Sequence, residues 1–538
     1  MKMKSQIKLV GAVFIAGVVL TGCGNSSTHS KKQVLNWETP ASLSTMDPAQ
    51  STDLYADQMM LASGEGLLRM QANNKVVPGV AKTYSVSKNG KTWTFDLRHS
   101  KWSDGSQLTA KDFVNSWRRT VNPSTKSQYA YMFSDIKNAA KITAGKLAPS
   151  QLGVKANNNY QLTVHLTKAQ PAFKYLVSAS CYLPENQAAL KKYGHRFGTN
   201  STTNTYNGPF LLKGWNGTND TWHLVKNPKY WNAKNIQLHR INVQAVKNPS
   251  TALNSYESGK LDFTYLSGTQ VKQYEHNRNY HLFKDTGMFY IEMNERKDRL
   301  LKNRLIRRAL SLTINRQQYA NKVLSDGSVP AKGLVADNMA KRNGRDFADQ
   351  AYVKGAVAYN LAQAKKDWQR GLKQVNKKSA TLTLVSDDKD TSKQGAEFIQ
   401  SSLEKLPGLK VTIQSVPLNN RVSRAANGQF DLILSGTIND YPDPDDSISA
   451  MTTNNVANNG KWHNSAFDRL INRAENTDAN HESARWNDLA QAEKILMTDQ
   501  GVIPLYQQSL ATLIRPSVKG LQFMPTAPEW DWTKTHMN

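Results

Sequence analysis

The chain has 538 residues, 39% of them hydrophobic, with a formal net charge of +27 at pH 7. This length corresponds to two or three domains of ordinary size, and the composition excludes collagen-like and disordered classes. A large positive charge is typical of nucleic-acid-binding proteins. Here the basic residues are scattered along the chain, so we predict no nucleic-acid partner and expect a basic surface facing an anionic cell envelope.

The first residues have the parts of a secretory signal peptide. Lys2, Lys4 and Lys8 make a positively charged start, and an unbroken run of apolar and small residues follows at 9–20. This run is shorter than the ~18–20 residues that span a bilayer, so it indicates a signal peptide over residues 1–22 rather than a membrane helix.

The signal peptide ends on a cysteine in a lipoprotein-like context. Leu20-Thr21-Gly22-Cys23 resembles the bacterial lipobox, in which the cysteine carries diacylglycerol and becomes the new N-terminus. We therefore predict lipidation of Cys23, a polar stalk over residues 23–32, and a protein held at the extracellular face of the membrane of a Gram-positive-type bacterium. An ordinary signal peptide that contains a cysteine is the alternative.

Cys181 is the second of the two cysteines. If Cys23 carries lipid, Cys181 has no partner for an internal disulfide. Its apolar surroundings predict a small buried residue, with a reactive thiol as the alternative.

Strand and helix patterns change along the chain. Trp93, Phe95 and Leu97 alternate with polar residues and predict a strand over 91–98, and a second alternating run follows at 160–166. Between them, Thr109 and Asp112 have the spacing of a helix N-cap. Phe113 and Trp117 then supply the buried face of that helix.

The region from residue 381 alternates between strand and helix. We expect strands at 381–385, 409–413 and 430–434, with helices at 397–406 and 421–426 between them. This order favours an α/β lobe with a largely parallel sheet covered on both faces. The fold class is therefore α/β, with a hairpin-rich α+β part and an α/β part.

The sequence contains none of the common catalytic signatures. It lacks the G-x-S-x-G, H-E-x-x-H, C-x-x-C and G-x-G-x-x-G motifs, and its histidines do not pair at metal-ligand spacing. The four aspartates between 440 and 446 are dense enough to suggest calcium, but prolines interrupt them and the glycine of a calcium loop is missing. We predict no enzyme activity, no metal and no cofactor.

Short motifs in a fixed order span nearly the whole chain after the leader. Together they resemble the family of peptide-binding lipoproteins that serve oligopeptide and dipeptide ABC importers, known as extracellular solute-binding protein family 5. The motifs are Asn36-x-Glu38-x-Pro40, Met46-Asp47-Pro48, Pro78-Gly79-Val80-Ala81-Lys82, Trp93-Thr94-Phe95, Leu97-Arg98, Lys101-Trp102-Ser103-Asp104-Gly105, Thr109-Ala110-Lys111-Asp112-Phe113, Trp117-Arg118-Arg119, Asn122-Pro123, Tyr206-Asn207-Gly208-Pro209-Phe210, Lys226-Asn227-Pro228-x-Tyr230-Trp231, Gly259-x-Leu261-Asp262, Arg307-Arg308-Ala309-Leu310, Asp440-Tyr441-Pro442-Asp443-Pro444 and Ile503-Pro504-Leu505-Tyr506.

The resemblance implies a two-lobed, hinged fold of the periplasmic-binding-protein type II class with an extra inserted domain. It implies a discontinuous lobe I, an inserted domain II and an α/β lobe III that closes over the ligand, with two crossovers as the hinge. The expected ranges are 33–66, 203–288 and 506–538 for lobe I, 67–202 for domain II, and 289–505 for lobe III.

The resemblance also implies peptide capture for delivery to the permease subunits of an ABC importer. It places Asp440 against the peptide ammonium group, and Gly436, Thr437 and Ile438 would offer backbone groups to an extended peptide. Tyr129 is expected to line the cleft, and Ser42 and Leu43 are further candidates. Capping of a turn by Asp440 and a core role for Tyr129 are the alternatives.

Two departures from the family pattern concern ligand preference. Thr437-Ile438-Asn439 stands where many relatives have an aromatic residue, and Leu434 stands where some have an arginine. The resemblance therefore does not extend to side-chain preference or to the way the peptide carboxylate is held. A family member that binds a non-peptide ligand (a nickel chelate, haem or a sugar) is one alternative. A secreted peptidase and a surface adhesin are the further alternatives.

Overall fold

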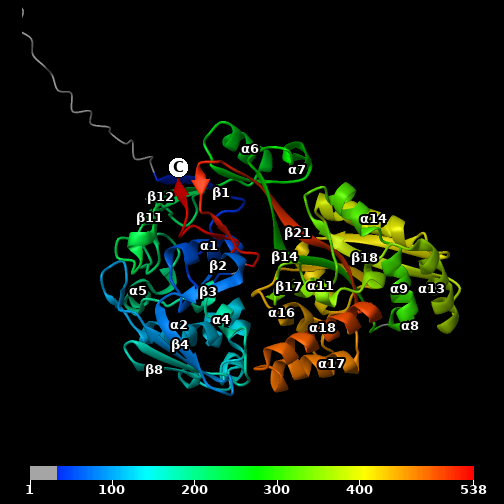
Figure 1. Cartoon of the computed structure of the whole chain (residues 1–538), viewed down its shortest axis with the longest axis horizontal. Coiled ribbons are helices and arrows are strands. Elements are labelled where there is room, and N and C mark those ends of the chain that lie inside the picture. The colour runs from blue at the N-terminus through cyan, green and yellow to red at the C-terminus, as the bar shows by residue number, and fades with distance from the viewer. Residues whose placement is uncertain (1–32, 52, 297–298, 527) are drawn as a thin grey trace, which may run out of the picture. The chain divides into compact units, whose positions relative to one another are not determined.

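A computed structural model describes residues 33–51, 53–296, 299–526 and 528–538. The predicted signal peptide, the stalk and Cys23 lie outside this range. The helices and strands form three groups (Figure 1), and we name the three largest buried hydrophobic clusters cores A, B and C. Within the described ranges, none of the helices combines the length and apolarity that crossing a bilayer requires.

Core A joins the amino-terminal segment, a middle segment and the carboxyl-terminal segment. Trp37 stacks on Phe263 with ring centroids 3.7 Å apart, and Trp530 meets Trp37 edge-on. A four-stranded sheet in the order β1-β12-β11-β10 backs these rings, and β1 and β12 are parallel. The elements are β1 (Val34–Thr39), α1 (Leu54–Ser63), β10 (Phe210–Lys213), β11 (Thr221–Lys226), β12 (Arg240–Ala245), β22 (Val518–Lys519), β23 (Gln522–Phe523), β24 (Trp530–Asp531) and β25 (His536–Met537).

Core B contains the predicted alternating strand and capped helix. Trp93, Phe95 and Leu97 are buried on one face of β5, and the capping box of Thr109 and Asp112 opens α2. The antiparallel sheet has the order β4-β5-β9-β8. The elements are β2 (Leu68–Gln71), β3 (Lys75–Pro78), β4 (Ala81–Val86), β5 (Thr92–Leu97), β6 (Ser100–Lys101), β7 (Gln107–Leu108), α2 (Ala110–Val121), α3 (Ala139–Thr143), β8 (Val154–Asn158), β9 (Gln161–His165), α4 (Phe173–Leu176) and α5 (Gln187–Tyr193).

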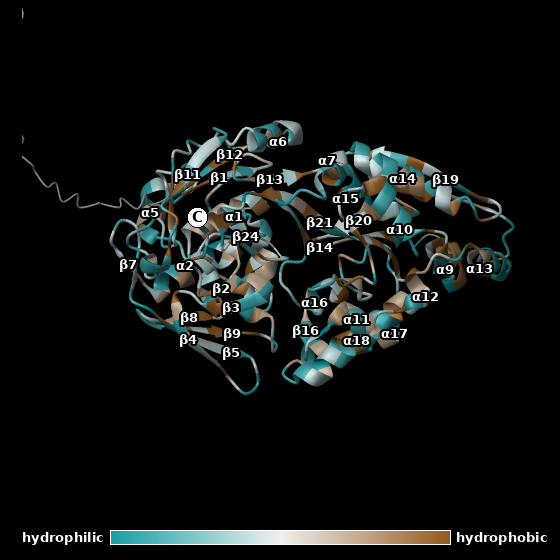
Figure 2. Cartoon of the chain, turned by 45° about the horizontal axis from the view of Figure 1, so that its top comes forward, coloured by the Kyte–Doolittle hydropathy of each residue, from teal (hydrophilic) through white to brown (hydrophobic). Residues whose placement is uncertain are grey.

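Core C lies against a seven-stranded sheet with the order β13-β21-β14-β20-β18-β19 and β15 beside β21. Figure 2 shows hydrophobic and hydrophilic residues alternating along the covering helices, as their half-buried positions require. The sheet strands are β13 (Phe263–Leu266), β14 (Tyr280–Met293), β15 (Val329–Pro330), β18 (Ala380–Asp387), β19 (Leu409–Val416), β20 (Leu432–Thr437) and β21 (Val502–Ile514), and a separate hairpin consists of β16 (Lys341–Arg342) and β17 (Arg345–Asp346). The helices are α6 (Pro249–Glu257), α7 (Thr269–Tyr274), α8 (Arg299–Lys302), α9 (Arg304–Leu312), α10 (Arg316–Gln318), α11 (Phe347–Ala351), α12 (Lys354–Val357), α13 (Leu361–Gln374), α14 (Asp390–Leu403), α15 (Leu418–Ala426), α16 (Pro444–Ile448), α17 (Ser465–Asn472) and α18 (Glu482–Asp499).

The expectation of a largely parallel sheet is only partly correct. β18 is parallel to both β19 and β20, as the strand–helix alternation predicts. On the other side of β20, the strands β14, β21 and β13 pair antiparallel. β13 and β14 end more than a hundred residues before β20 begins, and β21 begins 65 residues after β20 ends. No local pattern could therefore reveal their direction.

The two longest strands connect the groups. β14 and β21 pair along most of their lengths and run side by side from the region of α6 and α7 toward β18 (Figure 1). Their register shifts between Lys284 and Met288, and again between Phe289 and Tyr290. Register shifts of this kind bend a strand pair locally.

The predicted domain boundaries stay a prediction, and the cores show where packing changes. Leu67 already belongs to core B, and Tyr182 is its last buried member, whereas Leu183 packs in core A. The expected boundaries at 288/289 and 505/506 fall inside β14 and β21. The chain therefore crosses between the groups within continuous strands rather than through loops.

Candidate ligand-binding site

A cavity of about 500 Å³, which we name the central cavity, lies between elements of core A and the sheet of core C. Residues of α1 and the carboxyl-terminal segment line one side, and β20, α14 and α15 line the other. The lining residues are Pro40, Leu54, Tyr55, Tyr265, Leu266, Ser267, Gly268, Phe289, Tyr319, Leu324, Asp326, Asp387, Thr391, Ser392, Arg421, Leu434, Ser435, Gly436, Ile438, Leu505, Tyr506, Gln508, Ser509, Leu510, Ala511 and Glu529.

The end of β20 presents an unpaired edge to this cavity. β18 pairs with β20 only at Leu432 and Ile433. On its other side, β20 pairs with β14 at every residue from Leu432 to Thr437. Residues 434–437 therefore pair with a described strand on one side only, and Gly436 lines the cavity. Unpaired strand edges bind extended chains through main-chain hydrogen bonds.

Asp440 follows this edge on the loop that leads to α16. Its carboxylate accepts a hydrogen bond from the Tyr131 hydroxyl at 2.7 Å, and its backbone N–H donates to Asp446 Oδ2 at 2.9 Å. Burial raises the pKa of Asp440 above its ordinary value, and the Tyr131 hydrogen bond opposes the shift. The turn-capping alternative does not match this geometry, because Asp443, not Asp440, caps α16.

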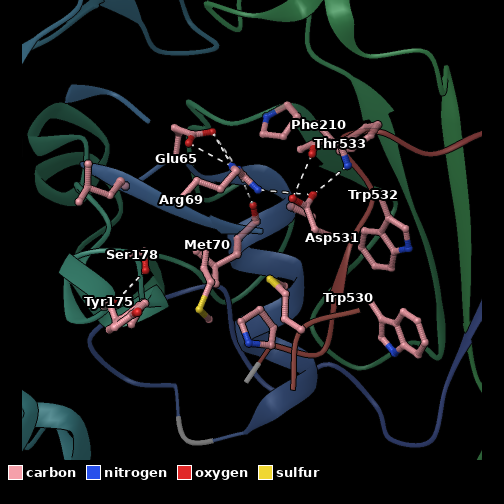
Figure 3. A pocket seen from close by; sticks show the side chains of 18 of the residues that line it. Glu65, Arg69, Met70, Tyr175, Ser178, Phe210, Trp530, Asp531, Trp532 and Thr533 are labelled. Atoms are coloured by element: carbon pink, nitrogen blue, oxygen red, sulfur yellow. Dashed lines mark hydrogen bonds and ion pairs between the residues drawn. The ribbon is translucent and has the colours of Figure 1, made fainter. Parts of the chain in front are cut away.

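Asp440 also lines a smaller cavity of about 30 Å³, the Asp440 pocket, where residues of all three groups meet. Arg69 lies in its wall, bound to Glu65 at 2.8 Å and facing Asp531 at 3.7 Å (Figure 3). The Tyr230 hydroxyl donates a further hydrogen bond to Glu65. The guanidinium charge of Arg69 is thus balanced by two carboxylates, which leaves Asp440 without a cationic partner in this pocket.

The predicted cleft tyrosine, Tyr129, and its neighbour Tyr131 have separate partners. Tyr129 donates to Asp57 Oδ2 at 2.9 Å and packs against core B, and it lines neither of the two cavities. Tyr131, in the same short 3₁₀ helix η3 (Gln128–Phe133), is the residue that reaches Asp440. Sequence reasoning missed Tyr131. Its partner lies 309 residues away in the chain, so no local pattern could have indicated this contact.

The remaining predicted residues are divided between the cavity and the core. Gly436 and Ile438 line the central cavity, and Thr437 pairs with Met288 of β14 without joining the lining. Leu43 is buried in core A, where it is 3% exposed. The Ser42 hydroxyl donates to Asp220 at 2.7 Å, and neither Ser42 nor Leu43 lines either cavity.

Arg421 supplies a basic side chain to the central cavity. It extends from α15, and its Nε donates to Asp387 Oδ1 at 2.8 Å. Leu434 of β20 also lines this cavity, and the arginine in its wall comes from α15. Arg421 could not be assigned to the cavity from the sequence, since residues 421–426 showed only helical spacing.

Cys181 and Arg307 are both buried in the structure. Cys181 is 1% exposed, and burial raises the pKa of its thiol, as a packed structural residue requires. Arg307, which stands with Arg304 and Arg308 on α9, is 3% exposed and pairs with Glu295 at 3.0 Å and Asp499 at 3.1 Å. That guanidinium joins helix ends within core C and is not part of a basic surface patch.

Comparison with known proteins places this geometry in a family. Residues 75–459 match the model of the bacterial extracellular solute-binding proteins, family 5. The dipeptide-binding protein of Lactococcus lactis subsp. cremoris is 33% identical over 546 residues, covering 98% of both chains. Among solved structures, Listeria monocytogenes OppA bound to peptide has a TM-score of 0.77 and 33% identity, covering 95% of this chain and 100% of that one.

A second solved structure, the unliganded open form of the murein tripeptide-binding protein MppA, has a TM-score of 0.80 and 28% identity, covering 94% of this chain and 98% of that one. The match therefore extends over all three cores and both connecting strands, and the expected two-lobed architecture of mixed α/β composition is confirmed. This chain belongs to the bacterial extracellular solute-binding proteins of family 5.

Proposed function

We propose that the protein captures oligopeptides outside the cell and delivers them to the permease subunits of an ABC importer. The observation that carries this proposal is the unpaired edge at 434–437, which opens into the central cavity and leads directly to Asp440. The peptide-bound relative from Listeria monocytogenes supports the same ligand class.

Main-chain recognition explains how such a site accepts many sequences. A peptide that lies along residues 434–437 places its amides and carbonyls against strand groups that have no other strand partner. Because all peptides share these groups, affinity depends little on side-chain identity. The cavity of about 500 Å³ leaves room for side chains, with water filling the rest.

Asp440 provides the counter-charge for the peptide ammonium group. Its carboxylate is half-buried and holds a single described hydrogen bond, from Tyr131. An ammonium group that enters here forms a charge-assisted hydrogen bond, which contributes about 1.5–3 kcal/mol. Tyr131 fixes the carboxylate orientation before the ligand arrives.

The test compares Asp440→Asn with Asp349→Asn, a control that removes an exposed carboxylate away from the central cavity. We expect Asp440→Asn to weaken binding of a free-amino peptide by about 10–100-fold in calorimetry and hardly to affect its N-acetylated form. The control variant should bind both peptides as the wild type does. Equal losses for both peptides in Asp440→Asn would remove the assigned role.

Native mass spectrometry of the purified protein tests the ligand class itself. Peptides enclosed between the two sides of the cavity should co-purify, and a mixture of peptide masses is the expected result. A single non-peptide mass, such as a metal chelate, haem or sugar, would overturn the proposal. Unchanged masses after prolonged incubation would argue against a peptidase.

We further propose that acylated Cys23 holds the protein on the outer face of the membrane. The lipobox-like sequence supports this, and the resulting diacyl group gives stable attachment where a single chain does not. Replacing Cys23 with serine should release the protein into the medium without altering peptide affinity. Retention of the Cys23→Ser protein in the membrane fraction would contradict it.

A further inference from the structure

The carboxyl-terminal segment contributes a buried carboxylate to the central cavity. Glu529 precedes β24, lines the cavity and is 8% exposed. Its Oε2 accepts a hydrogen bond from the Tyr265 hydroxyl at 3.3 Å. Trp530 Nε1 donates to the same hydroxyl oxygen at 2.9 Å, which directs the hydroxyl proton toward Glu529. The carboxylate is therefore held in a fixed place in the cavity wall.

No basic residue among those the structure describes forms an ion pair with Glu529. Instead, its neighbours are acidic or phenolic. Glu38 accepts from the Tyr265 backbone N–H at 2.9 Å, and its other oxygen is buried without a hydrogen-bond partner. Asp285, from β14, is 3% exposed and faces Glu529 from the connecting strands. A buried carboxylate without a counter-charge is costly, and an incoming cation relieves that cost.

A second polar group that lines the central cavity also has no partner among the described residues. Ser509 of β21 lines the central cavity and is 6% exposed, and its hydroxyl makes no hydrogen bond with the described residues. Buried polar groups are almost always hydrogen-bonded in native structures. The unpaired Ser509 hydroxyl thus indicates, independently of the carboxylates, that the central cavity binds a polar ligand group.

The opposite wall does not neutralise Glu529. Among the described residues that line the central cavity, Arg421 is the one basic side chain, and it is bound to Asp387 at 2.8 Å. Asp326 adds another carboxylate to the lining. With Arg421 paired to Asp387, the described lining offers no free cationic side chain to Glu529.

We propose that Glu529 and Ser509 form a subsite for the cationic side chain of a bound peptide, so that the protein selects peptides with a lysine or arginine facing the carboxyl-terminal segment. This inference rests on the proposed peptide-binding function and names its preferred substrates. Glu529 accepts the charged head group, and Ser509 Oγ accepts a further N–H of the same group.

The titration of the site gives the preference a pH dependence. Burial, together with nearby Asp285, raises the pKa of Glu529 to about 8, and burial raises those of Glu38 and Asp285 to about 7. Tyr55 and Tyr265 also face Glu529, and their pKa values are raised as well. Because Glu529 is largely protonated near neutral pH, a cationic side chain must displace its proton. Affinity for basic peptides therefore rises with pH up to the Glu529 pKa.

The test uses alanine peptides with a single lysine placed at each position in turn, paired with Nε-acetyllysine at the same position. We expect one position at which the wild type binds lysine about 10-fold or more tightly than acetyllysine. Glu529→Gln should abolish that preference while retaining affinity for the all-alanine peptide. Glu38→Gln is the matched control, because Glu38 is equally buried beside Tyr265 but does not line the cavity.

The peptide experiment distinguishes failure of the subsite from failure of the proposed peptide-binding function. Failure of every peptide to bind the wild type would overturn peptide binding itself. Normal peptide binding without a lysine preference, or with a preference that survives in Glu529→Gln, would overturn the subsite alone.

A measurement on the wild type covers the case in which Glu529→Gln does not fold. Calorimetry near neutral pH, in buffers of different ionisation enthalpy, should show close to one more proton released with the lysine peptide than with its acetyllysine partner. Equal proton release for the two peptides would contradict the subsite. That result would indicate that protonated Glu529 donates a hydrogen bond to a neutral peptide group.

Discussion

In its proposed role, Asp440 couples the charge of the ligand to proton binding. Burial raises its pKa in the unliganded site, and it lies beside Asp446, whose pKa burial and Asp440 raise to about 7. A bound ammonium group stabilises the ionised form of Asp440 and so lowers its pKa in the complex. Peptide binding therefore includes the free-energy cost of deprotonating Asp440 whenever the pH lies below its unliganded pKa.

This linkage predicts that affinity for a free-amino alanine peptide falls as the pH drops through the unliganded pKa of Asp440. The loss approaches about tenfold per pH unit well below that pKa, and deprotonation of the peptide amine above about pH 8 adds a second decline. Calorimetry across this range should give a bell-shaped profile. Asp440→Asn and the N-acetylated peptide should each lack the acidic limb due to Asp440, and an unchanged limb in both would contradict the linkage.

The role of a single residue could be predicted from the sequence where it depends on neighbours in the chain, and not where it depends on residues far away in the chain. Asp440 was assigned through its place in a motif, and Cys181 through its apolar neighbours. Tyr131 lies 309 residues before its partner Asp440, and Glu529 receives its surroundings from β1, β13 and β14. Contacts between such distant residues form only when the chain folds, so no local spacing predicts them.

The β20 strand illustrates how an element can make a binding surface through close backbone packing. A Cβ atom on Gly436 would approach the Phe289 ring to 2.6 Å, and Phe289 stacks on Tyr506 with ring centroids 4.6 Å apart. Gly436 therefore lets β20 lie flat on this aromatic pair, with its unpaired edge facing the cavity.

We predict that Gly436→Ala displaces either Phe289 or the strand edge. Overpacking of this kind costs about 1–3 kcal/mol of unfolding free energy, and peptide affinity should fall with it. Gly355→Ala is the control, because a Cβ there meets no atom within 4 Å. Denaturant unfolding and peptide titration of both variants check this. Wild-type affinity in Gly436→Ala would show that the edge does not contact the peptide.

The bounds of an element were predicted correctly where a local motif defines them. They were not predicted where pairing with a strand far away in the chain defines them. α2 begins at the expected capping box and buries Phe113 and Trp117 completely. β20 was expected over 430–434 but runs over Leu432–Thr437, because its pairing with β14 extends it beyond the apolar run. That shift adds Ser435, Gly436 and Thr437 to the strand and so creates the binding edge.

At the scale of the whole molecule, polar contacts join the core B and core C groups. Lys168 Nζ contacts Glu475 Oε2 at 2.9 Å, and Asn74 Nδ2 donates to the Met339 carbonyl at 2.9 Å. Together with the Tyr131–Asp440 hydrogen bond, these contacts stabilise the arrangement in which the two sides of the site lie close. The bulged pair β14 and β21 is the predicted hinge between them.

Reversing the Lys168 charge should therefore weaken peptide binding. For a partly exposed ion pair we expect a loss of about 2–5-fold in Lys168→Glu, and partial or full recovery in the double variant Lys168→Glu with Glu475→Lys. Lys332→Glu disrupts a pair within the core C group and should leave affinity unchanged. Calorimetry of peptide binding by these variants tests this prediction. If the double variant does not recover peptide affinity, the Lys168–Glu475 pair has no role in closure.

The burial of Cys181 makes the folded protein convenient for optical work. A secreted form that begins after the stalk has Cys181 as its sole thiol, and that thiol is enclosed beside Met132 with its proton retained. Maleimide dyes react with accessible thiolates, so cysteines introduced on the outer surfaces of the two sides can be labelled without first replacing the native one. Energy transfer between such dyes would report opening and shutting of single molecules in real time, in an otherwise wild-type background.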